Sequence, residues 1–239
     1  AIARVPDRLK NDPGLVYERL RWRRKKGKNE FAQKLLTTPT AESVVPRRWW
    51  REREILARRA LRAGHVSAAY SLAKNHGLPK DQRQGLIGAE WLAGWIALQF
   101  LRGNDDKKAA YTHFVVAYRN ATYPISRARG AYWAGRAAQA SGYDRKANTW
   151  FRRALIHPTT YYGQLAAARL PDAKRLELPP LPGIDHEKVT GFDNDELVVA
   201  VRTIIKADLQ EVLRPLIRQI NKQDNSFTWR AKVADLALE

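Results

Sequence analysis

The chain has 239 residues, of which 44% are hydrophobic, the ordinary content of a folded protein with a buried core. Its 43 basic and 24 acidic residues give a formal net charge of +19, which predicts attraction to anionic polymers. Cysteine is absent, which excludes a disulfide scaffold, a thiolate metal site and a cysteine nucleophile. No apolar run reaches the ~20 residues of a transmembrane helix, so we expect no membrane-spanning segment.

Helical signals follow one another along almost the whole chain. Asn11 or Asp12 is a suitable N-cap ahead of Pro13, and Gly64 and Gly77 are typical of helix ends. No alternating strand pattern persists, so the fold class is all-α. In chain order, we expect helices over residues 15–26, 29–36, 47–63, 66–75, 86–101, 105–120, 126–141, 144–156, 161–170, 193–206, 208–221 and 226–238.

An internal repeat organises these helices. The segment GAEWLAGWIALQFL begins at Gly88, and the similar segment GAYWAGRAAQASG begins 42 residues later at Gly130. Recurrence at roughly 40 residues is typical of stacked helix pairs. The second helix of each pair carries a small residue four positions before a large one, which lets neighbouring helices approach closely. These small–large pairs are Ala68 with Leu72, Ala110 with Phe114, and Ala147 with Phe151.

The repeat predicts a right-handed α-superhelix of hairpins like those of tetratricopeptide repeats. We expect this domain to span residues 1–170. Residues 171–191 contain Leu-Pro-Pro-Leu-Pro-Gly, which cannot form a regular helix, so an extended proline-rich connector is expected there. Residues 192–239 are expected to form further helices.

Several segments together resemble the helical region of the soluble lytic murein transglycosylases of Gram-negative bacteria. The resemblance is close over about residues 11–170 and rests on NDPGLVYERLRWRRKKG, AAYSLAKNHGL, GAEWLAGWIALQFL, YPISRARGAYWAGRAAQASG and HPTTYYGQLAAARL. It implies a periplasmic protein whose superhelix forms part of a ring or horseshoe and precedes a separate lysozyme-like domain. That domain cleaves the bond between N-acetylmuramic acid and N-acetylglucosamine to 1,6-anhydro products, with one glutamate acting first as acid and then as base.

The residues of that catalytic domain do not occur in this chain. The family's motif is a Glu-Ser pair followed by Gly-Leu-Met-Gln, whereas Glu42-Ser43 is followed by Val-Val-Pro, and Ile217-Arg218-Gln219 is followed by Ile-Asn. We therefore expect no catalytic residue, and we expect the chain to stop before the catalytic domain. The resulting hypothesis is a non-catalytic scaffold that positions peptidoglycan strands, and cell-wall proteins are further possible partners. A stand-alone adaptor for protein partners is the alternative, and a polyanion binder is a third.

The residues expected to bind substrate cluster around the helix 126–141. Arginine grips carboxylates bidentately, and peptidoglycan carries carboxylates. The competing interpretation is that the arginines bond carbonyls and acids between repeats. The substrate-binding candidates are Arg127, Arg129, Arg136, Tyr132, Tyr161 and Tyr162.

The remaining aromatic and charged residues favour structural roles. Trp91 and Trp95 share a helix face, where core packing competes with stacking on sugar rings. No histidine pair has metal-ligand spacing, so we expect capping or core hydrogen bonds, no metal and no cofactor. The basic cluster 19–28 is interpreted as a solvated surface, and nucleic acid is not expected as a partner.

Overall fold

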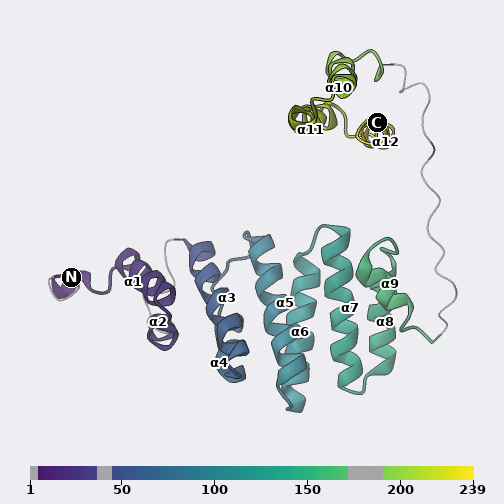
Figure 1. Ribbon diagram of the computed structural model, residues 1–239. Helices are drawn as coiled ribbons and strands as arrows, with labels where there is room; N and C mark the ends of the chain where they lie inside the picture. Colours follow the sequence, from purple (N-terminus) through teal and green to yellow (C-terminus); the bar gives the residue numbers. More distant parts are fainter. Residues whose placement is uncertain (1–4, 37–44, 172–182, 184–190) are drawn as a thin grey trace. The chain divides into compact units, whose positions relative to one another are not determined.

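The computed structural model describes residues 5–36, 45–171, 183 and 191–239, and everything described is helix, turn or loop without a strand (Figure 1). The all-α prediction is therefore confirmed over these ranges. The chain forms two compact units, residues 1–178 and 179–239. The expected connector, residues 171–191, falls almost wholly outside the described residues.

Among its described residues, the first unit contains a short 3₁₀ helix, η2 Asp7–Leu9, and nine α-helices, each of which packs on the next along the chain. Figure 1 shows α3 to α8 lying side by side in chain order. Helices two apart also touch, because α5 contacts α7 and α7 contacts α9. The bounds are α1 Pro13–Lys25, α2 Asn29–Leu35, α3 Pro46–Arg62, α4 Val66–Lys74, α5 Arg83–Phe100, α6 Asn104–Asn120, α7 Pro124–Ala140, α8 Asp144–Leu155 and α9 Tyr161–Ala167.

Glycine ends the first helix of three of these pairs. After α3, Gly64 has φ of +78°, and the N–H of His65 donates to the carbonyl of Ala60 at 2.9 Å. Gly27 and Gly142 close α1 and α7 in the same way. This arrangement satisfies helix-end carbonyls, and a side chain would be strained at the left-handed φ that it requires. The glycines therefore set where each hairpin turns.

Two continuous hydrophobic clusters fill the first unit, one from α1 to α5 and one from α5 to α9. Two of the three small–large pairs predicted from the repeat are buried in this core; in the third, Leu72 is buried but Ala68 is only partly buried. Ala110 and Phe114 of α6, and Ala147 and Phe151 of α8, are all buried. Phe114 packs against Gly94 of α5, and Phe151 packs against Gly135 of α7. In each of these two hairpins, a glycine on the first helix leaves room for a phenylalanine ring from the second helix.

The second unit has a small core of its own, formed by α10 Glu196–Lys206, α11 Leu213–Gln223 and α12 Phe227–Leu236, with a short 3₁₀ helix, η5 Gln210–Val212. Asp208 was expected to begin the middle helix. Instead it follows the end of α10 with φ of +55°, and the N–H of Leu209 bonds to the carbonyl of Ile204. Asp tolerates this left-handed conformation, which is common just after a helix end. Asp208 therefore ends α10, although an Asp in the sequence is also typical of a helix start.

Candidate functional site

An unbroken series of aromatic rings crosses α5, α7 and α9 of the first unit. We call this series the aromatic run. Trp91 and Trp95, four residues apart on α5, stack with ring centroids 6.0 Å apart, and Trp91 meets Trp133 of α7 edge to face at 6.1 Å. In order, the run comprises Phe100, Trp95, Trp91, Trp133, Tyr132, Tyr162 and Tyr161, with successive centroids between 5.1 and 6.1 Å apart.

Two arginines of α7 lie on the aromatic run. Residues seven apart share a helix face, which places Arg129 and Arg136 on the same side. The Arg129 guanidinium sits 5.2 Å from the Trp91 ring centroid, and that of Arg136 sits 5.9 Å from the Trp133 ring. Burial lowers the pKa of Arg129 from its ordinary value, and stacking on an aromatic face offsets part of the cost of desolvating the cation.

The structure thus brings together five of the six sequence-predicted binding residues and separates the sixth. Arg136 donates to the Tyr132 hydroxyl at 3.2 Å, Tyr132 contacts Tyr162, and Tyr162 contacts Tyr161. Arg129 lies on the same face of α7. Arg127 points elsewhere, because it is two residues from Arg129 on the helix and donates to Tyr118 of α6 at 3.0 Å.

The members of the run differ in how much surface they expose. Tyr161 is 68% exposed, whereas Tyr132 is 4% exposed and packs against Phe151 of the core. The run is therefore buried at Tyr132 and accessible at both ends, at Tyr161 at the start of α9 and at Phe100, which is 42% exposed. Trp133 also belongs to it, although the sequence did not place this residue in the candidate site. Its position next to Tyr132 was the available signal, but adjacent residues on a helix point in different directions.

Two indole N–H groups in the run are buried without a hydrogen-bond partner among the described residues. They belong to Trp91 and Trp133, whose rings touch. A buried donor without a partner costs roughly 1–3 kcal/mol. The packing of the aromatic rings and arginines therefore outweighs this cost in the folded state.

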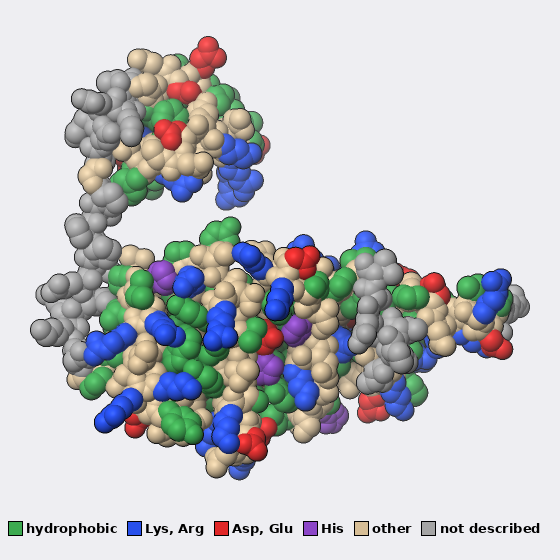
Figure 2. Space-filling model, turned by 180° about the vertical axis from the view of Figure 1, so that it is seen from behind, with side chains coloured by type: hydrophobic (Ala, Val, Ile, Leu, Met, Phe, Trp, Pro, Cys, Tyr) green, Lys and Arg blue, Asp and Glu red, His purple; other side chains and the backbone are tan. Residues whose placement is uncertain are grey.

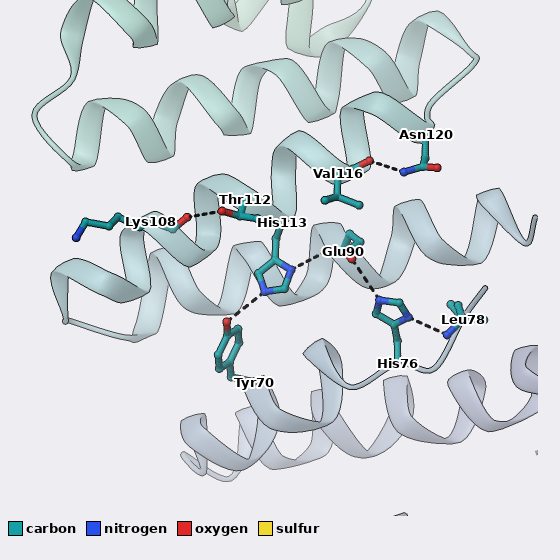
Figure 3. A network of polar contacts seen from close by, with 9 residues as sticks. All are labelled: Tyr70, His76, Leu78, Glu90, Lys108, Thr112, His113, Val116 and Asn120. Carbon is teal, nitrogen blue, oxygen red and sulfur yellow. Dashed lines mark hydrogen bonds and ion pairs between the residues drawn. The ribbon is translucent and has the colours of Figure 1, made fainter. Parts of the chain in front are cut away.

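A polar network joins three helices next to the run (Figure 3). The carboxylate of Glu90 on α5 faces Nδ1 of His113 at 2.5 Å and Nε2 of His76 at 3.3 Å. The Leu78 N–H donates to Nδ1 of His76 at 2.9 Å, so His76 carries its proton on Nε2 and donates it to Glu90. On the far side of His113, Nε2 meets the Tyr70 hydroxyl of α4 at 3.1 Å.

The network holds Glu90 ionised. Burial raises the pKa of its carboxyl, but the hydrogen bonds that it accepts from His113 and His76 outweigh burial and lower this pKa to about 2. A glycosidase acid needs the opposite, a carboxyl whose pKa is raised so that it can donate a proton. Glu90 is thus built to be a hydrogen-bond acceptor, and it is the single charged residue in the apolar segment 88–101.

The remaining question about the histidines and acids is whether they cap helices, make hydrogen bonds or hold a metal ion. His76 and His113 make hydrogen bonds within the fold, as the sequence predicted for the histidines, whereas His65 precedes α4 without a side-chain cap. His186 and Glu42 lie outside the described residues. Within the described ranges, no group of three His, Cys, Asp or Glu side chains is arranged to hold a metal ion.

One feature of the basic cluster 19–28 differs from its interpretation as a solvated surface. Arg24 forms a two-pronged ion pair with Glu52 of α3, and the Glu52 side chain is only 3% exposed. The Arg23 guanidinium donates to the Phe31 carbonyl at 2.8 Å. Part of the cluster therefore ties α1 to its neighbours.

Comparison of the chain with protein-family models, with curated proteins and with solved structures finds no match. Among the described helices, none combines the length and the apolar character that crossing a bilayer requires. Figure 2 shows one face of the first unit, where Lys and Arg side chains are set among hydrophobic ones over the packed helices.

Proposed function

We propose that this chain is the non-catalytic helical scaffold of a periplasmic soluble lytic transglycosylase. Its helix hairpins would form a right-handed superhelix like that of tetratricopeptide repeats, and its aromatic run would hold peptidoglycan strands for a catalytic domain elsewhere. The observation that carries the proposal is the aromatic run with Arg129 and Arg136 on one face.

The chemistry of the run suits an acidic glycan. Aromatic rings present broad apolar faces against which the apolar faces of sugar rings can pack. Arg136, half-buried beside Tyr132, offers guanidinium donors to the carboxylates that peptidoglycan carries. The net charge of +19 adds a long-range attraction to an anionic polymer. The exposed Tyr161 would be the first ring that a strand meets.

The same proposal assigns no bond cleavage to the chain. The carboxyl group of Glu90 has a lowered pKa, the opposite of what a glycosidase acid needs. Binding energy at the run would instead serve to place the strand, which raises the rate of a reaction carried out by another domain.

Cosedimentation with purified peptidoglycan sacculi at 0.15 M salt tests the proposal. The variant Arg136→Gln/Tyr161→Ala should bind at least about tenfold more weakly than the wild type, the loss expected from removing one charged hydrogen bond and one stacked ring. Its matched control is Arg145→Gln/Tyr123→Ala, which changes the same residue types; Tyr123 is 67% exposed and Arg145 is exposed on α8. Equal sedimentation of both variants and the wild type would remove the run as the binding face. Clearing of a sacculus suspension by this polypeptide would contradict a non-catalytic role.

A further inference from the structure

A hollow of the first unit lies beside the aromatic run and shares Arg129 with it. It is an open groove of about 880 Å³ where the starts of α3, α5 and α7 come together. A volume of this size lies near the upper end of the range for small-molecule pockets, so a short peptide can occupy it. We call it the N-terminal groove, after the helix ends that line it.

Four arginines and two acids line the N-terminal groove. They are Arg47, Arg51 and Glu54 of α3, Asp81 and Arg83 at the start of α5, and Arg129 of α7. Three of the arginines, Arg47, Arg51 and Arg83, are exposed and make no hydrogen bond or ion pair with any residue that the structure describes. The groove therefore presents three free guanidinium groups to solvent.

The two acids are not equivalent. Glu54 accepts hydrogen bonds from Arg58 on the same helix at 2.9 and 3.2 Å, so its charge is already balanced. Asp81 is exposed and has no partner among the described residues. Besides Arg129, which stacks on Trp91, the groove thus combines three exposed, unpaired cations with one exposed, unpaired anion.

The helix ends add to the positive field. None of α3, α5 and α7 has a side-chain hydrogen bond at its N-cap, which is Val45, Gln82 and Tyr123 respectively. The first backbone N–H groups of a helix lack intrahelical partners and carry partial positive charge. Three such ends therefore reinforce the arginines in attracting carboxylates.

We propose that the N-terminal groove binds a short extended peptide bearing two or three carboxylates and one amine. Arginine clusters recognise acidic motifs through charge-assisted hydrogen bonds, and Asp81 would pair with the amine. A nucleic acid fits less well, because its affinity depends on many phosphate contacts and its uniform negative charge would face Asp81. This site goes beyond the sacculus-binding function proposed above and does not depend on it.

The test measures binding of fluorescently labelled peptides by anisotropy at 0.15 M salt. The probe is a blocked seven-residue peptide with three glutamates and one central lysine. The variant Arg47→Gln/Arg51→Gln/Arg83→Gln should bind it at least about tenfold more weakly, because charge-assisted hydrogen bonds are lost. The control Arg102→Gln/Arg119→Gln/Arg145→Gln removes the same net charge from exposed arginines outside the groove and should change binding less than about twofold.

Two further arms test the chemistry of the ligand. Asp81→Asn should weaken binding of the lysine peptide, whose amine loses its carboxylate partner, and should tighten binding of a peptide with norleucine in place of lysine, whose carboxylates no longer face the Asp81 charge. Equal weakening by the two triple variants would show a general charge effect and overturn the proposal. Tighter binding of polyphosphate or of a single-stranded oligonucleotide than of the peptide would also overturn it, as would the absence of peptide binding. The single variant Arg51→Gln changes the surface least, and it should also bind the lysine peptide more weakly than the wild type.

Discussion

The ring of Phe151 on α8 occupies the space in which residue 135 on α7 would otherwise carry its Cβ. A Cβ built on Gly135 would lie 2.6 Å from the nearest ring atom of Phe151. The same relationship joins Gly94 of α5 to Phe114 of α6, with a distance of 2.9 Å. The repetition shows that consecutive hairpins close around the same kind of contact.

Substitution of Gly135 by Ala is therefore expected to destabilise the first unit. The added methyl group would overlap a buried ring, and overpacking of this kind costs about 1–3 kcal/mol. The matched control is Gly88→Ala on α5, where a Cβ would meet nothing within 4 Å. Because Ala is the better helix former, this variant should gain about 0.5–1 kcal/mol. Urea unfolding of both variants gives the two free energies, and equal effects would refute the packing argument.

Breaking the ion pair between Arg24 and Glu52 is expected to lower the free energy of unfolding more than Gly135→Ala does. Arg24→Met would leave the Glu52 carboxylate in a buried place without its partner, which costs about 3 kcal/mol. The double variant Arg24→Met/Glu52→Met removes both charges and should recover most of that loss. Thermal unfolding of the two variants and the wild type checks this ordering. A double variant as unstable as the single one would mean that packing, not the uncompensated charge, dominates.

Glu90 predicts a dependence of stability on pH. Its pKa is lowered from 4.5 to about 2 in the folded chain, so the network stabilises the fold above pH 4.5 and loses this effect as pH falls towards 2. Glu90→Gln should therefore lower the free energy of unfolding at pH 7 by about 2 kcal/mol, after allowance for solvent screening. Urea titrations from pH 7 to pH 3 should show the difference between wild type and variant narrowing. A constant difference over that range would rule out ionisation of Glu90 as its source.

In the second unit, the indole N–H of Trp229 on α12 is expected to stabilise the fold. This group donates to the Ile220 carbonyl at 2.8 Å, and the ring packs edge to face on Phe192 with centroids 4.8 Å apart. Trp229→Phe keeps an aromatic ring but loses the donor, which should cost about 1–2 kcal/mol. Trp22→Phe is the control, because Trp22 is largely exposed. Circular dichroism during urea unfolding distinguishes the two variants.

Much of the helical pattern could be predicted from residue order, because caps, glycines and apolar spacing act locally. Asp12 accepts the N–H of Leu15 at 3.0 Å, and Gly64 closes α3, as expected from their types. Helix boundaries were predicted wrongly where one residue type can occur at either a helix start or a helix end. Asp208 ends a helix instead of beginning one. The helix expected to begin at Ser126 begins instead at Pro124, whose fixed φ suits a first turn.

The candidate sites depend on contacts that residue order does not encode. The sequence by itself determined that the chain is helical, repeats at about 40 residues and carries arginines beside tyrosines on one segment. Only the tertiary structure decided that Arg127 bonds to Tyr118 of α6, that Glu90 lies between two histidines, and that three helix starts enclose one groove. The reason is physical: helix formation depends on neighbours within a few residues, whereas these arrangements depend on how separate helices pack.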